Sequence, residues 1–288
     1  ADSLALSCSD YVVTEAGFGA DMGAEKALHI KSLASGKTPD CVVINVTVRS
    51  MKLHGGGFST GGGKRPPKEE LESENVDATR KGAASNLRRH VRNISMTGLP
   101  VVVSINKFST DTDAEIQVIA DEAKLAGAKD VVIFRGHVEG GLGAGELADA
   151  VVNACKKHDE SGRQYSPIVE SGMSARETIL KIATNVYGAH NVDFSPEALR
   201  SFETLKKWDL DKLPVCMAKT QYSFSHEAAE LGAPTGFTLP IREIRINAGA
   251  GFLVVICGSM MTMPGLPKRP AAMDMDMDED GNLMGVFG

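Results

Sequence analysis

The sequence contains no apolar run long enough to cross a lipid bilayer and no block of consecutive basic residues. Its longest apolar run, Phe252–Cys257, falls far short of the roughly 18 residues that a membrane-spanning helix needs. The formal net charge is −6 and the isoelectric point is about 5.7, so no strongly basic surface is expected. These absences argue against a membrane protein and against a nucleic acid as partner.

Cysteine is scarce, with five residues scattered singly along the chain. The odd number and the lack of a C-x-x-C pair argue against a disulfide framework and against a zinc cluster. Cys41, Cys216 and Cys257 lie within apolar runs, which predicts buried, reduced thiols of the kind usual in cytosolic proteins. The acidic run at 274–280 lacks the spacing of a calcium loop, so no metal site is predicted.

The first ten residues have no Met, no basic segment and no apolar segment of the kind that a secretory signal peptide carries. They also lack a helix cap, so the chain reads as if it begins within a domain. We expect a cytoplasmic location. Mitochondria and plastids stay open as alternatives, because a transit peptide would precede Ala1.

What the sequence does contain is enough apolar material for a folded core. The 288 residues are 42% hydrophobic and 24% charged, which suits one large domain or two smaller ones. Short β-branched runs alternate with amphipathic stretches through the first half, a pattern typical of βαβ units and a parallel sheet. Strands are expected at 10–14, 41–48, 99–105 and 130–134, with helices at 24–34, 68–95, 113–127 and 146–157.

The pattern changes after about residue 160. Helices are expected at 171–189 and 195–207, followed by strands at 213–220, 237–246 and 251–257 with little helix between them. We therefore predict an α/β fold with a mostly parallel sheet and flanking helices over 1–160, and a smaller α+β region over 161–288.

Polar and glycine residues follow the expected strands, where ligands bind in parallel sheets. The segment 14–26 is rich in glycine and carries Phe18 between two glycines, an unusual place for a core residue. Its ordinary interpretation is a βα loop that needs positive φ angles. After the second strand, Arg49, Lys52 and His54 bring cationic and titratable groups suited to phosphate or carboxylate.

The sequence matches two nucleotide-binding motifs only in part. The string 57–65 has Phe58 and Arg65 where a phosphate-binding P-loop requires Gly and Ser or Thr, so a flexible surface loop is expected. Asn106 and Lys107 begin a guanine-reading motif, but Ser109 replaces its carboxylate. His137 follows the fourth strand, where a hydrogen-bonded loop histidine and a ligand-binding one are equally compatible with the sequence.

Several longer strings occur in a fixed order. They are TEAGFGADMGAEK at 14–26, KLHGG at 52–56, NKFSTDT at 106–112, EGG at 139–141, LPVCMAKT at 213–220 and MTMPGLP at 261–267. In this order they closely resemble formate–tetrahydrofolate ligase (formyltetrahydrofolate synthetase), alone or as the synthetase part of a C1-tetrahydrofolate synthase. The resemblance runs from about residue 8 to the end and implies a P-loop-NTPase-like fold.

The resemblance implies a ligase of one-carbon metabolism. In such an enzyme, ATP and formate give formyl phosphate, whose formyl group then passes to N10 of tetrahydrofolate. That chemistry needs cationic and amide donors for phosphate, Mg²⁺ on the nucleotide, and flat walls for the pterin ring. ATP with Mg²⁺ and tetrahydrofolate are thus the implied ligands, with a monovalent cation as a further option.

The resemblance also assigns roles to residues. The implied folate-binding residues are Phe18, Phe108 and His137, and the implied catalytic residues are Lys52, His54 and Glu15. The implied formyl-phosphate and nucleotide contacts come from Gly19, Asp21, Gly23, Arg49 and Asn106.

Two departures from the family pattern bear on function. His137 stands where the family usually has a tryptophan, and imidazole offers less stacking surface. The family's P-loop lies in the N-terminal half of a longer chain, and these residues resemble its C-terminal half. The chain is expected to supply the folate and formyl-phosphate half of a site, to be inactive alone, and to need the P-loop half as partner, within a homo-oligomer. The alternative is an inactive homologue that serves as a binding or structural subunit.

Overall fold

The computed structural model describes residues 1–60, 66–258, 270–273, 275–279 and 283–284. The chain divides into two compact units, 1–258 and 259–288. In the second unit, a 3₁₀ turn η7 (Ala271–Met273) precedes an antiparallel pair, β8 (Asp276–Met277) and β9 (Leu283–Met284). The MTMPGLP string lies outside the described residues, as does 61–65 of the loop after α3.

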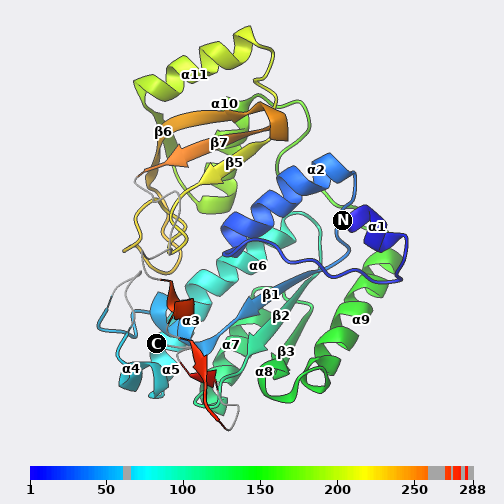
Figure 1. The fold of residues 1–288 in the computed structure, drawn as a ribbon, viewed down its shortest axis with the longest axis vertical. Helices are drawn as coiled ribbons and strands as arrows, with labels where there is room; N and C mark the ends of the chain where they lie inside the picture. Colours follow the sequence, from blue (N-terminus) through cyan, green and yellow to red (C-terminus); the bar gives the residue numbers. More distant parts are fainter. Residues whose placement is uncertain (61–65, 259–269, 274, 280–282, 285–288) are drawn as a thin grey trace. The chain divides into compact units, whose positions relative to one another are not determined.

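A three-stranded parallel sheet forms the centre of the first half of the larger unit (Figure 1). Its strands lie in the order β1 (Val42–Val46), β2 (Val101–Asn106) and β3 (Asp130–Phe134), with Val42 opposite Val101 and Val102 opposite Asp130. The predicted α/β class with a parallel sheet and flanking helices is therefore confirmed.

Strand β2 is covered on both faces, as its continuous apolar run predicts. On one face Val101, Val103 and Ile105 pack against α6 (Arg88–Ser95) and α7 (Asp113–Leu125). On the other, Val102 packs against α9 (Gly145–Ser161). Helix α7 begins at a capping box, in which Thr112 accepts from the amide of Glu115 and the Glu115 side chain accepts from the amide of Thr112.

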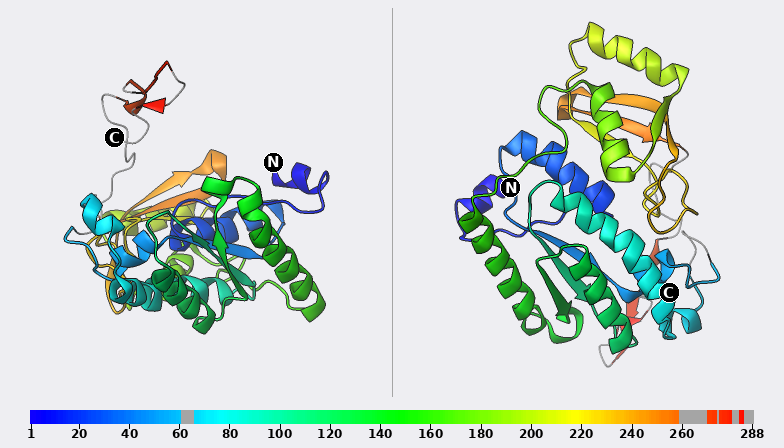
Figure 2. Two further views of the ribbon diagram at one scale, coloured as in Figure 1. Left: turned by 90° about the horizontal axis from the view of Figure 1, so that it is seen from below. Right: turned by 180° about the vertical axis from the view of Figure 1, so that it is seen from behind.

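A second, mixed sheet has the order β4 (Asn191–Phe194), β6 (Thr238–Asn247), β7 (Phe252–Cys257) and β5 (Val215–Ala218). The β6–β7 pair is antiparallel, and β4 and β5 run parallel to their neighbours. Helices α10 (Ala175–Ile182) and α11 (Pro196–Lys207) share its core, and α10 lies against one face in the view from behind (Figure 2).

The remaining segments are short helices, some of which continue one another. Residues 20–35 form one helix with two π-helical stretches, made of η1 (Ala20–Ala24), η2 (Ala27–Lys31) and α2 (Ser32–Ser35). The others are α1 (Asp2–Leu6), α3 (Val48–His54), α4 (Lys68–Glu72), α5 (Val76–Gly82), η3 (Ala83–Leu87), α8 (Gly136–Glu139), η4 (Leu142–Ala144), η5 (Ala183–Tyr187) and η6 (Ala248–Ala250). None of the helices in the described part is long and apolar enough to cross a membrane.

Three predictions about the chain need correction. The expected strand at 10–14 does not form: it pairs with no strand of the described chain, and Val13 is 89% exposed. Its β-branched residues favour extended backbone, but a strand also needs a hydrogen-bonding neighbour. The expected helix at 68–95 is interrupted at 73–75, and β4 was not anticipated. Of the three thiols expected to be buried, Cys257 is buried but Cys41 and Cys216 are only half-buried, and all five thiols are free. The boundary near residue 160 stays a prediction.

Candidate functional site

Helix α3 carries the cationic residues at the carboxyl edge of the parallel sheet. It starts directly after β1 because Thr47 and Ser50 form a capping box, with each backbone N–H donating to the other residue's hydroxyl. Arg49, Lys52 and His54 therefore lie on one short helix at the edge where ligands bind in such sheets.

Lys52 is buried in an ion pair. Its side chain is 1% exposed, and Nζ lies 2.8 Å from Oε1 of Glu115 and donates to the Ser73 carbonyl at 2.7 Å. Burial raises the pKa of Glu115, but hydrogen bonds from Lys52 and from the amides of Asn75 and Thr112 outweigh it and lower that pKa. The Lys52 ammonium thus joins α3 to the end of α4 and the start of α7.

Phe108 is held in place by a turn that follows β2. Its N–H donates to Oδ2 of Asp111 at 2.8 Å, and the Asp111 N–H donates to the Phe108 carbonyl at 3.1 Å. The Arg49 guanidinium lies 4.3 Å from the centre of the Phe108 ring, a cation–π contact. An aromatic wall and a cation therefore meet at this edge of the sheet.

The same place contains buried polar atoms without a hydrogen-bond partner in the part of the chain that the structure describes. They are Nε of Arg49, Oγ1 of Thr110 and Oδ1 of Asp111. Burial raises the pKa of Asp111, against the opposing hydrogen bond from Phe108 and the charge of Arg49. Because buried polar groups almost always have partners, these three atoms make this edge the candidate site for a ligand.

Asn106 and His137 lie at the same edge. Asn106 ends β2 and is paired in register with Phe134, the last residue of β3. His137 follows in α8 and is exposed. The structure therefore brings five of the predicted residues to one edge: Arg49, Lys52, Asn106, Phe108 and His137.

His54, at the end of α3, does not supply the cationic group expected of it. Its Nδ1 accepts a hydrogen bond from the Gly232 N–H at 3.1 Å. Burial, helped by the nearby His90, lowers the pKa of His54 to about 4, against a smaller opposing effect of Asp21. The imidazole is therefore neutral at neutral pH and anchors the loop that contains Gly232.

The glycine-rich segment at 15–24, a loop that runs into the first turn of the helix at 20–35, is the second part of the candidate site. Glu15 is exposed, and Phe18 is 81% exposed at the tip. Gly19 has φ +76°, and a Cβ on Gly23 would lie 1.6 Å from the Gly17 carbonyl oxygen, so only glycine fits there. The loop follows an extended segment, not the strand that was expected before it.

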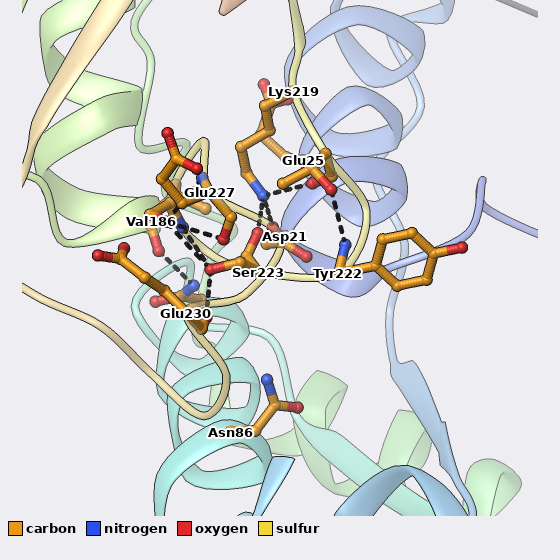
Figure 3. A network of polar contacts seen from close by, with 12 residues as sticks. Asp21, Glu25, Asn86, Val186, Lys219, Tyr222, Ser223, Glu227 and Glu230 are labelled. Carbon is orange, nitrogen blue, oxygen red and sulfur yellow. Dashed lines mark hydrogen bonds and ion pairs between the residues drawn. The ribbon is translucent and has the colours of Figure 1, made fainter. Parts of the chain in front are cut away.

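Asp21 fixes this loop to the second sheet. It is buried, and its Oδ2 lies 2.6 Å from Nζ of Lys219, which follows β5 (Figure 3). Burial lowers the pKa of Lys219, and the charge of Asp21 opposes this shift. Sequence reasoning assigned no role to Lys219 or Glu115. The Thr112-x-x-Glu115 spacing is a sequence signal for the latter, whereas nothing local indicates the burial of Lys219.

Comparison with known proteins agrees with the resemblance of the ordered strings. The model of the family "Formate--tetrahydrofolate ligase" matches residues 1–287. A curated formate–tetrahydrofolate ligase from Paracoccus denitrificans (strain Pd 1222) is 48% identical over 283 residues, which cover 98% of this chain and 48% of that protein. The chain thus spans about half the length of the curated relative it matches. With matches over nearly all of its residues, the chain belongs to the formate–tetrahydrofolate ligase family.

Proposed function

We propose that this chain forms the folate-binding and formyl-phosphate-binding part of a formate–tetrahydrofolate ligase. The reaction converts ATP, formate and tetrahydrofolate to 10-formyltetrahydrofolate, ADP and phosphate through formyl phosphate. The observation that carries the proposal is the contact of Arg49 with Phe108 beside the unpartnered atoms of Thr110 and Asp111. Membership of the family supports the same assignment.

Each group at the carboxyl edge has a chemical task in this proposal. The free face of the Phe108 ring stacks on the pterin, and Phe18 contributes a second aromatic surface from the glycine-rich loop. Arg49 donates through Nε to the anionic formyl phosphate while its guanidinium plane stays on Phe108. Oδ1 of Asp111 accepts a hydrogen bond from a ligand N–H.

The nucleotide is assigned to residues beyond this segment. No glycine-rich loop ending in Lys and Ser or Thr occurs in the 288 residues. No three His, Cys, Asp or Glu side chains converge as cation ligands in the part of the chain that the structure describes, so no residue of this part is assigned to Mg²⁺ or to a monovalent cation. We further propose that the chain is inactive alone, works with the P-loop half of the protein, and assembles as a homo-oligomer.

The test is calorimetric binding of tetrahydrofolate to the 288-residue chain. We expect Phe108→Ala to weaken binding at least tenfold and Trp208→Ala, at an exposed tryptophan after α11, to leave it unchanged. No binding by the unaltered chain contradicts the folate assignment.

Catalysis is tested separately by formate- and tetrahydrofolate-dependent ADP release, with and without the N-terminal half. Turnover only with that half is expected. Turnover by the chain alone contradicts the assignment of the nucleotide, and tetrahydrofolate binding without turnover in either case favours an inactive binding or structural subunit.

A further inference from the structure

Lys219 is a wholly buried lysine that the proposed function does not use. It directly follows β5, at the carboxyl end of that strand, and its side chain is 0% exposed. Lysine is almost never fully buried unless it is paired, because removing an ammonium from water is costly. The surroundings of Lys219 therefore need an explanation.

Three oxygen atoms and an aromatic ring surround the ammonium, and its contacts with Asp21 and Ser223 are drawn in Figure 3. Its partners are the carboxylate of Asp21 at 2.6 Å, the carbonyl of Thr220 at 3.1 Å and the carbonyl of Ser223. Nζ also lies 4.9 Å from the centre of the buried Tyr187 ring. An ammonium has three N–H donors, so all of them are used and none is left for a ligand. Lys219 is thus a connecting group between segments of the chain.

One connected segment is the loop that presents Phe18. The amides of Met22 and Gly23 donate to the Gly19 carbonyl, at 3.0 Å and 2.6 Å, and Gly23 lies directly against Gly17. Asp21 and Phe18 therefore belong to one closely packed segment. We expect a displacement of Asp21 to move the backbone that carries Phe18.

The other segment is the loop after β5. The hydroxyl of Ser223 donates to the Glu230 carbonyl at 2.5 Å, and the Gly232 N–H donates to Nδ1 of His54 at 3.1 Å. His54 ends α3, the helix that carries Arg49. A chain of contacts therefore runs from the Phe18 loop through Asp21 and Lys219 to the helix of Arg49.

We propose that Lys219 is a positioning residue of the tetrahydrofolate site. Its ion pair with Asp21 holds the Phe18 loop in a fixed position relative to α3. The inference rests on the proposed function for the identity of the ligand, but not for the position of the loop. A buried ion pair adds little net stability, but separating its two charges is costly, so the pair favours the arrangement in which Asp21 and Lys219 meet.

The test compares Lys219→Met with the double variant Asp21→Asn/Lys219→Met. The double variant removes both charges and replaces the single variant in the measurements if the latter does not fold. Leu205→Ala, in the core of the second sheet, is the control for general loss of stability. We expect both Lys219 variants to raise the Kd for tetrahydrofolate at least tenfold and to speed amide hydrogen exchange at 17–23 at least tenfold. Exchange in β2 should stay unchanged, and Leu205→Ala should alter neither the Kd nor the loop.

Changes of less than twofold in both readouts, in a folded variant, overturn the proposal. If the unaltered chain does not bind tetrahydrofolate, the proposed function fails, and hydrogen exchange at 17–23 still decides whether Lys219 holds the loop. In the ligase completed with its N-terminal half, Lys219→Met should raise KM for tetrahydrofolate while KM for ATP stays unchanged. An equal rise in both overturns the assignment to the folate site.

Discussion

The ion pair between Lys52 and Glu115 should couple strongly in stability measurements, because both side chains are removed from water. They are 1% and 0% exposed, and their charged atoms are 2.8 Å apart. Breaking a buried pair by removing one partner typically costs about 3–5 kcal/mol. The two single substitutions should nevertheless differ, because the atoms left behind have different remaining partners.

Lys52→Met leaves Glu115 with hydrogen bonds from the amides of Asn75 and Thr112, so the cost should be about 3 kcal/mol, the lower end of that range. Glu115→Gln keeps an oxygen acceptor beside the ammonium but removes the only ion-pair partner that the structure gives it within the described residues, so the cost should approach about 5 kcal/mol. In the double variant neither charge is left buried without a partner, so the loss should be smaller than that of either single substitution and far below their sum.

The assay is equilibrium unfolding in urea at pH 7, followed by circular dichroism. Lys181 and Glu170 provide a matched control: their charged atoms are 2.9 Å apart, but the side chains are 32% and 71% exposed. Substituting Lys181→Met or Glu170→Gln should cost less than about 1 kcal/mol. Additive losses for Lys52 and Glu115, or single losses as small as in the control, would contradict the predicted coupling between the two side chains.

Three further predictions concern pH, the glycine-rich loop and the thiols. Burial holds the pKa of His54 at about 4, below the 6.5 of an unfolded histidine. The contribution of the neutral imidazole to the free energy of unfolding is therefore complete above pH 6.5. It is lost as the pH falls toward 4, by about 3 kcal/mol in total. His54→Gln should flatten the dependence of the urea midpoint on pH in that window, and an unchanged slope contradicts this. Gly23→Ala should weaken tetrahydrofolate binding at least tenfold in calorimetry, because its Cβ would overlap the Gly17 carbonyl. Gly145→Ala, at a glycine with open space around it, should not weaken binding. Equal affinities of the two variants would contradict a role of the glycine-rich loop in binding tetrahydrofolate. Burial raises the pKa of Cys41 and of Cys257 to about 12, whereas Cys8 is exposed. Iodoacetamide at pH 8 should therefore label Cys8 first, which mass spectrometry of peptides can establish. Rapid labelling of Cys257 would be inconsistent with its burial.

Much of the fold is readable from short stretches of sequence. The run 101–105 predicts a strand buried on both faces, and the helix after Thr112 begins at the residue that its capping box indicates. The expected strand at 10–14, which does not form, shows what such short stretches cannot predict. Those residues have β propensity, but propensity does not provide a neighbouring strand, and the segment is extended without being part of a sheet.

For the candidate site, the sequence alone determined the family, through long strings in a fixed order, and the residue types at the carboxyl edge of the sheet. The tertiary structure decided what those residues can do: Lys52 is paired with Glu115, His54 is neutral, and Asp21 meets Lys219 from the far half of the chain. The physical reason is that propensity, periodicity and capping act over a few neighbouring residues. The charge and partner of a buried group depend instead on which distant segments close around it and exclude water.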